Sequence, residues 1–239
     1  MLYNKSVYIF ILNRLSANNI RIRKGMNMKD FIINILLSLP ALFLALSVHE
    51  FSHGYAAYKM GDPTAKHMGR LSLNPMAHFD LIGSLCLLLF RFGWAKPVPI
   101  NPNNFKDRKK GIIVVSLAGP FSNFVVAIIS TVIYGLYVRF TYHSGIEWVY
   151  LIGEMIRNCI LLNIGLMIFN LIPIPPLDGS KVLMEFLPYN ARRVMYDIER
   201  YSFLILILLM NTTVMQKLLS VLNSAMLDVV NMILRLILK

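Results

Sequence analysis

Residues 31–53 read FIINILLSLPALFLALSVHEFSH, an apolar run followed at once by two histidines and a glutamate. The apolar run is long enough to form most of a membrane-spanning helix. On that helix His49 and His53 project from one face, because residues four apart lie above one another. Ionisable groups are rare at membrane depth, where they mark functional sites. The HExxH pattern therefore predicts a metal site, with His49 and His53 as ligands and Glu50 beside them as a general base.

The composition indicates a membrane protein. Of the 239 residues, 56% are hydrophobic and 15% are charged, against about 25% charged residues in soluble domains. The net charge of +12 is better explained by loops facing anionic lipid than by nucleic-acid binding, because no nucleic-acid recognition motif accompanies it. Cys86 and Cys159 lie in apolar segments without CxxC spacing and are interpreted as small buried hydrophobic residues.

Long apolar blocks predict an α-helical polytopic membrane protein. Residues 81–90 form a shorter block, about half a span, which we interpret as a re-entrant or surface segment. The polar stretches around it carry turn residues and short strand-like runs. We expect a three-helix core plus C-terminal helices, with short β or re-entrant segments between the first two core helices. The expected spans are residues 31–58, 112–138, 148–172 and 202–222.

The chain is expected to form one membrane domain, since it shows no internal repeat. Residues 1–30 form a basic segment whose apolar patch is too short to span a membrane. Translation from Met26 or Met28 is a hypothesis that would remove most of this basic charge. The expected division is residues 1–30 for the N-terminal segment, 31–187 for the core and 188–239 for the C-terminal transmembrane and amphipathic helices.

A tetrahedral zinc site needs a third protein ligand, which leaves the fourth position for water. His67, His78 and His143 all lie in polar loops. Asp178, in NLIPIPPLDG just after the third span, is the stronger candidate. Its alternative role is that of a helix N-cap, since an aspartate before GSKVLMEF would cap a helix well. Spacing alone leaves both interpretations of Asp178 open.

Three motifs in one order resemble the site-2 protease family of intramembrane zinc metalloproteases: HEFSH in an apolar helix, AGPFSN in the next long span, and NLIPIPPLDG downstream. The resemblance covers residues 36–187. It implies one Zn²⁺ per chain held by His49, His53 and Asp178, with Glu50 as the catalytic base. It also implies that Asn123 contacts substrate or the developing oxyanion; the alternative is a polar residue that bonds neighbouring helices.

The resemblance is closest to the compact members of the family, because the loops are too short to hold a PDZ or CBS domain. It implies a membrane-protein substrate, cut within a transmembrane helix as in regulated intramembrane proteolysis, and a location in a bacterial cell membrane. The lipid bilayer is the other expected partner. Because the carbonyls of a helix are already hydrogen-bonded, such a substrate must unwind locally. The strand-like residues 67–73 and 98–101 are candidates to pair with it.

A metal-binding transporter or a non-proteolytic scaffold is the alternative function. Either would explain polar residues inside a membrane. Neither requires a glutamate next to the two histidines, whereas a hydrolase does. The presence of Glu50 therefore favours the metalloprotease.

The metal site constrains the topology. His53 and Asp178 can share an ion only if an even number of crossings separates them, because metal–ligand bonds are ~2 Å long. We therefore expect residues 112–138 and 148–172 to cross and residues 81–90 not to. Residues 59–111 then lie on one side with nine Lys and Arg, which the positive-inside rule assigns to the cytoplasm. The active site is expected to open on that side.

The third span carries further polar residues. Asn163 and Asn170 share a helix face and are expected either to line a water path to the metal or to bond neighbouring helices. Glu154 and Arg157, three residues apart, are expected to pair and to reach the outer membrane interface.

Overall fold

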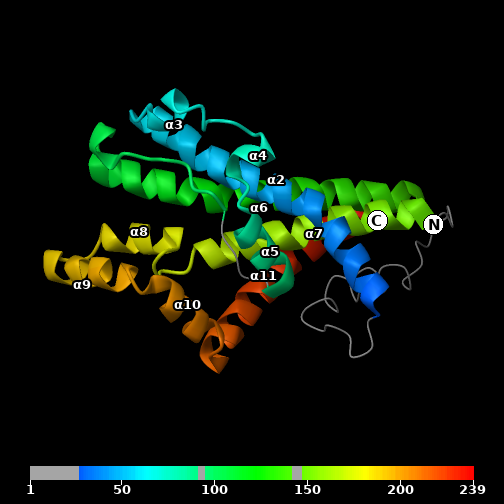
Figure 1. The fold of residues 1–239 in the computed structure, drawn as a ribbon. Coiled ribbons are helices and arrows are strands. Elements are labelled where there is room, and N and C mark those ends of the chain that lie inside the picture. The colour runs from blue at the N-terminus through cyan, green and yellow to red at the C-terminus, as the bar shows by residue number, and fades with distance from the viewer. Residues whose placement is uncertain (1–26, 91–94, 142–146) are drawn as a thin grey trace.

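The computed structural model describes residues 27–90, 95–141 and 147–239 (Figure 1). The basic N-terminal segment up to residue 26, with the alternative start at Met26, lies outside the described residues, as does His143. All regular structure in the described ranges is helical. The longer helices are α2 (Met28–Met60), α6 (Arg108–Thr141), α7 (Glu147–Asn170), α9 (Tyr189–Glu199) and α11 (Thr213–Leu238). The short ones are α3 (Thr64–His67), α4 (Pro75–His78), α5 (Leu81–Phe90), η1 (Pro102–Asn104), α8 (Asp178–Met184) and α10 (Ser202–Met210).

Helices α2, α6 and α7 pack against one another as the core of the molecule (Figure 1). Each is long and apolar enough to cross a membrane, and α11 is a fourth such helix. At 1.5 Å of rise per residue, even α7 is longer than the ~30 Å hydrocarbon core of a bilayer. The predicted α-helical polytopic membrane fold, with a three-helix core and C-terminal helices, is confirmed.

Apolar side chains occupy both the packed and the outward faces of the core helices. Between α6, α7 and α11 a cluster of buried residues includes Ala127, Ile160, Ile164, Val230 and Leu234. The outward face of α6 exposes a further row of large apolar side chains: Leu117, Phe121, Val125, Ile129, Val132, Ile133 and Leu136. A helix that is apolar all round is the pattern of a membrane span, whose outer face meets lipid tails.

The chain between α2 and α6 contains short helices and extended segments, and within its described residues no strand forms. The strand-like residues 98–101 are extended without strand pairing, whereas residues 67–73 begin at the end of α3. Helix α5 has ten residues, too few to cross a bilayer. Among the described helices between His53 and Asp178, α6 and α7 are the two that are long and apolar enough to cross a membrane, an even number, in agreement with the expectation from the metal site.

The C-terminal span was predicted at the wrong residues. The structure ends α10 at Met210 and starts a new helix at Thr213, so residues 202–222 do not form one span. The break comes at Thr212, whose side-chain oxygen accepts a hydrogen bond from the Met215 N–H and caps α11. The fourth candidate span is α11, which includes the tail that we had interpreted as amphipathic.

The predicted ion pair between Glu154 and Arg157 is confirmed. Both side chains are buried, with residue exposures of 9% and 3%, and the Arg157 guanidinium donates to Glu154 Oε2. The pair is therefore enclosed by other protein atoms, and its location near the outer membrane interface stays a prediction. Buried charged groups are stabilised by pairing with one another within the protein.

Asp62 joins the end of α2 to the segment before α6. Its carboxylate is fully buried. Oδ1 accepts hydrogen bonds from the Thr64 N–H and hydroxyl and from the Asn104 amide, and Oδ2 accepts one from the Asn101 N–H at 2.7 Å. Although burial alone would raise the pKa of Asp62, these hydrogen bonds hold it below its usual range.

Asp62→Asn should destabilise the protein by about 1–3 kcal/mol at neutral pH, because buried donors lose a charged acceptor. A carboxyl group with a lowered folded-state pKa contributes stability above its unfolded pKa of about 3.9, and that contribution is lost as the pH falls through the folded pKa. The melting-temperature gap between wild type and variant should therefore narrow below about pH 4. A gap that widened in acid would contradict this assignment.

Candidate metal centre

Three potential metal ligands, His49, His53 and Asp178, converge at the packed centre of α2, α6 and α8. Their residue exposures are 6%, 7% and 6%. The two Nε2 atoms of the histidines are 3.0 Å apart, and Asp178 Oδ2 lies 3.3 Å from that of His49 and 3.1 Å from that of His53. Among the described residues these three form the group of His, Cys, Asp and Glu side chains close enough to hold a metal ion.

Local structure explains why these side chains meet. His49 and His53 are one turn apart on α2, so their rings share a face. Asp178 is the first residue of α8, and Leu177 occupies the N-cap position without a side-chain cap. The Asp178 carboxylate turns to the histidines, so the alternative role as an N-cap is not the one that the structure shows. Gly179 allows the start of α8 to lie close to the backbone that follows α7, because a Cβ at this position would lie 2.3 Å from the carbonyl oxygen of Leu171.

The hydrogen bonds behind the two histidines determine their protonation. His53 Nδ1 lies 2.7 Å from the backbone oxygen of Val115, which can only accept, so this nitrogen carries the proton. His49 Nδ1 lies 2.7 Å from Asn123 Oδ1 and donates to it for the same reason. In the neutral rings both Nε2 atoms then present lone pairs, with Asp178 Oδ2 as a third acceptor beside them.

Three acceptors this close together fit a shared cation. A tetrahedral zinc ion with bonds of about 2.0–2.1 Å places its ligand atoms about 3.3 Å apart, close to the observed separations of 3.0–3.3 Å. Each histidine also donates its Nδ1–H to an oxygen, the usual support for metal-ligating imidazoles. The three side chains and their surroundings therefore fit a zinc ion with one position left open.

Asn123 is buried behind His49, with no exposed surface. Its Oδ1 accepts a hydrogen bond from the His49 Nδ1–H, while its Nδ2 donates to Ala45 O at 3.1 Å and to Asn163 Oδ1 at 2.8 Å. Asn163 in turn donates to Cys159 O. These contacts match the alternative of helix bonding for Asn123 and Asn163. Contact of Asn123 with substrate or the oxyanion stays a prediction.

Other predicted polar residues lie elsewhere. Asn170 donates to the carbonyl of Leu166 in its own helix. His67 is exposed at the end of α3, and His78 is buried with its Nε2 2.6 Å from Ser72 O. Neither histidine belongs to the metal group.

Sequence reasoning missed three contacts at the site. The Lys181 ammonium lies 3.1 Å from Asp178 Oδ1, the oxygen that faces away from the histidines. The N–H of Val98 donates to Glu50 Oε2 at 3.0 Å. Gly119 allows α6 to lie close to the histidines of α2, because a Cβ at this position would lie 2.4 Å from His53 Nε2. The glycine had a sequence signal as part of AGPFSN, and Lys181 had one in its spacing of three residues from Asp178 on a helix. The contact between Val98 and Glu50 depends on tertiary packing.

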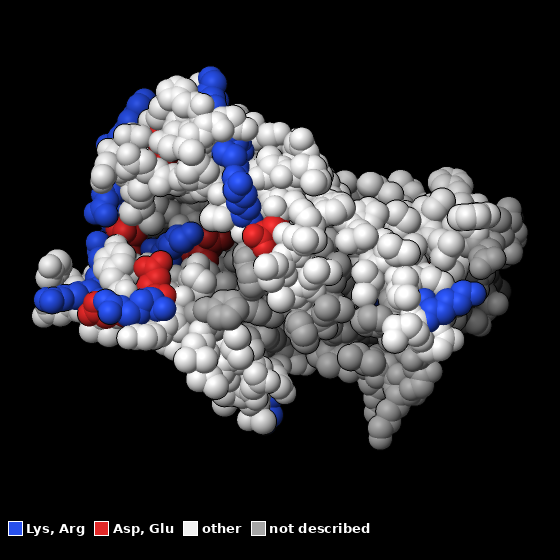
Figure 2. Space-filling model, in the orientation of Figure 1, with Lys and Arg blue, Asp and Glu red and all other residues white. Residues whose placement is uncertain are grey.

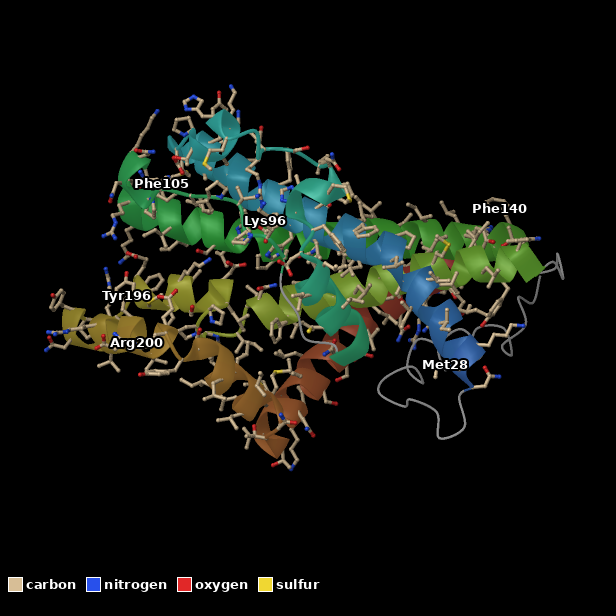
Figure 3. The ribbon with its side chains drawn as sticks, in the orientation of Figure 1. Met28, Lys96, Phe105, Phe140, Tyr196 and Arg200 are labelled. Carbon is tan, nitrogen blue, oxygen red and sulfur yellow. The ribbon has the colours of Figure 1, made fainter. Side chains whose placement is uncertain are left out.

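Charged side chains gather at one end of the molecule, around a hollow in its surface, and are sparse toward the other end (Figure 2). Figure 3 shows Tyr196 of α9 and Arg200, the residue that follows α9, at the same end as Phe105, with Phe140 of α6 at the opposite end. The described basic residues of the α2–α6 connection and those of α8 and α9 belong to the elements at this charged end (Figure 1).

The fold and the site together define a polytopic α-helical membrane protein with a His/His/Asp candidate metal centre among its core helices. The family model of Peptidase family M50 matches residues 141–212, a range that contains Asp178. The chain is 37% identical to a Bacillus subtilis protein named "Putative zinc metalloprotease YwhC", over 72% of this chain and 78% of the relative. It is 29% identical to "Putative zinc metalloprotease Rip2" of Mycolicibacterium smegmatis, over 76% and 69% respectively.

The chain therefore belongs to peptidase family M50, the site-2 protease family of metalloproteases. No solved structure matches it. The family prediction made from the three sequence motifs is confirmed.

Proposed function

We propose that this protein is an intramembrane zinc metalloendopeptidase that hydrolyses peptide bonds of transmembrane helices, as in regulated intramembrane proteolysis. The observation that carries the proposal is the convergence of two imidazole nitrogens and one carboxylate oxygen within 3.3 Å of one another. The relatives' names support zinc as the metal and proteolysis as the reaction.

Each residue of the site has a distinct task in this mechanism. His49, His53 and Asp178 hold the zinc ion, which supplies Lewis-acid chemistry when bound. The Glu50 carboxylate takes a proton from the attacking water and delivers it to the leaving amine. Asn123 keeps the ring of His49 in the orientation and tautomer that a metal requires.

The location of the site supports a membrane-embedded substrate. His53 lies seven residues before the end of α2 at Met60, about 10 Å along the helix axis. The surrounding helices expose apolar side chains to their outer surface. By the positive-inside rule the charged end faces the cytoplasm, so the site opens on that side of what we take to be a bacterial cell membrane.

The proposal is tested by zinc analysis and cleavage assays on detergent-purified full-length chain, comparing wild type with Asp178→Ala. We expect about one zinc per wild-type chain, and a loss of zinc together with cleavage of a synthetic single-span peptide in the variant. Ser180→Ala, which removes a hydroxyl bonded to Leu177 O in the same helix, is the matched control and should retain zinc. Wild-type protein that binds no metal under metal-replete conditions would refute the proposal.

A further inference from the structure

A proline-flanked segment lies against the face of α2 that carries Glu50. Residues 96–101 read KPVPIN, and we call them the proline segment; Figure 3 labels Lys96 at its start. Because proline has no backbone N–H, Val98 supplies the single amide donor of Pro97–Val98–Pro99. That donor is used on Glu50 Oε2, at 3.0 Å.

The Val98 side chain fixes the segment in place on the same helix face. It is 6% exposed and packs over Gly54, one turn after Glu50, where an added Cβ would lie 3.1 Å from Val98 Cγ1. Gly54 and Glu50 share a face because they are four residues apart. The side chain and the N–H of Val98 therefore contact neighbouring turns of α2.

The peptide group between Pro97 and Val98 has a charged partner at each end. Arg70 Nη2 donates to the carbonyl oxygens of Lys96 at 2.9 Å and Pro97 at 3.2 Å. The Pro97 carbonyl and the Val98 N–H belong to one peptide plane, so a cation and a carboxylate hold that plane from opposite sides. A hydrogen bond to the carbonyl also polarises the N–H and strengthens its bond to the carboxylate.

Both ends of the proline segment are anchored in addition. The Lys96 N–H donates to His78 O at 2.9 Å, and the Asn101 N–H donates to Asp62 Oδ2 at 2.7 Å. With the Val98 and Arg70 contacts, these bonds fix the segment at its two ends and at its centre. A segment held in this way can fix the direction of a carboxylate that is itself only partly buried.

We propose that the Pro97–Val98 peptide, clamped by Arg70, positions the Glu50 carboxylate for proton transfer. The inference rests on the proposed function, in which Glu50 is the base. With one oxygen of Glu50 bonded to Val98, the other is directed to the water. Arg70 is a positioning residue that acts on Glu50 through the peptide, without touching substrate or the reacting atoms.

The test compares two substitutions at Val98. Val98→Pro removes the N–H and keeps an apolar side chain, whereas Val98→Ala keeps the N–H and shortens the side chain. We expect Val98→Pro to lower kcat for a single-span transmembrane peptide about 10- to 100-fold, with zinc content unchanged, and Val98→Ala to retain most of the activity. Equal losses in both variants would show that packing, not the N–H, is responsible and would overturn the inference.

Substitutions at Arg70 provide a second test. Val98→Pro creates three consecutive prolines at residues 97–99, and this second test does not require the fold to accept them. Arg70→Ala should lower kcat with little change in KM, and Arg70→Lys should restore part of it, because lysine can still donate to the carbonyl. Lys66→Ala is the control, since Lys66 lies in α3, four residues before Arg70, and the contacts described for its side chain are all with the exposed Tyr58. In a Val98→Pro background, Arg70→Ala should add little further loss, because both changes break one connection.

Three outcomes separate this inference from the function on which it rests. Higher activity in Arg70→Ala would mean that the proline segment obstructs the site, which contradicts a positioning role. Additive losses in the double variant would show that Arg70 acts independently of the Val98 peptide. Zinc-loaded wild-type protein with no cleavage would refute the proposed function itself, and the inference with it.

Discussion

Glu50→Gln should retain about one zinc per chain and lose about 10²- to 10⁴-fold of the peptide-cleavage rate, the usual contribution of a general base. Glutamine is nearly isosteric with glutamate, and its carbonyl oxygen can still accept the Val98 N–H, so the fold and the three ligands should remain intact. It cannot take a proton from water. Zinc content by elemental analysis and single-turnover cleavage of a transmembrane peptide measure the two effects separately.

This variant also separates the protease from a metal-binding transporter or scaffold, which would not need a base. Asp80→Asn is the matched control. Asp80 is an acid in the chain between α2 and α6 whose Oδ1 accepts a hydrogen bond from the Gly83 N–H, and its substitution should not change the cleavage rate. Unchanged cleavage in Glu50→Gln would eliminate Glu50 as the base and with it the mechanism proposed above.

Gly119→Ala should reduce zinc affinity and cleavage together, each by about 10- to 100-fold. The added Cβ would lie 2.4 Å from His53 Nε2 and 2.6 Å from His49 Cε1, closer than atoms in a folded protein approach. Either α6 moves away from α2 or the two rings rotate, and both changes separate the ligands. Overpacking of this kind also destabilises proteins by about 1–3 kcal/mol. Competition with a chromophoric zinc chelator measures the affinity.

Gly165→Ala is the control for this substitution. Gly165 lies in the core helix α7, and a Cβ there would meet no atom within 4 Å. Alanine favours helix at that position, so zinc affinity and cleavage should match wild type. Equal losses of zinc affinity and cleavage in both variants would show that any glycine-to-alanine change in a core helix has this effect, so that the effect of Gly119→Ala is not specific to the metal centre.

Much of this architecture could be predicted because it depends on local patterns. The spacing of His49 and His53 fixes their shared helix face, and the length of the apolar blocks fixes the three core spans. Because His53 and Asp178 can share an ion only if an even number of crossings separates them, residues 81–90 were predicted not to cross the membrane. This prediction came from the length of metal–ligand bonds and not from hydropathy.

What could not be predicted depends on contacts between distant residues. Asp178 fits a helix N-cap and a metal ligand equally well in sequence. Only the packing of α8 against α6, which brings Asp178 to the histidines of α2, decides between them. The Arg70–Val98–Glu50 connection joins three segments with no motif in common. The C-terminal span was misplaced because Thr212 interrupts an apolar run, and a single capping residue carries little weight in a hydropathy average.

The ligands of the candidate metal centre come from opposite ends of the core: His53 and Asp178 are separated by 125 positions in the chain. During synthesis the histidines are made first, but they have no carboxylate partner until α6, α7 and the turn into α8 have been translated and have packed. A partly translated chain in the translocon therefore has the two histidines without Asp178 while it lies beside other nascent membrane helices. The order of the motifs along the polypeptide delays the onset of proteolysis until the enzyme has assembled its own core.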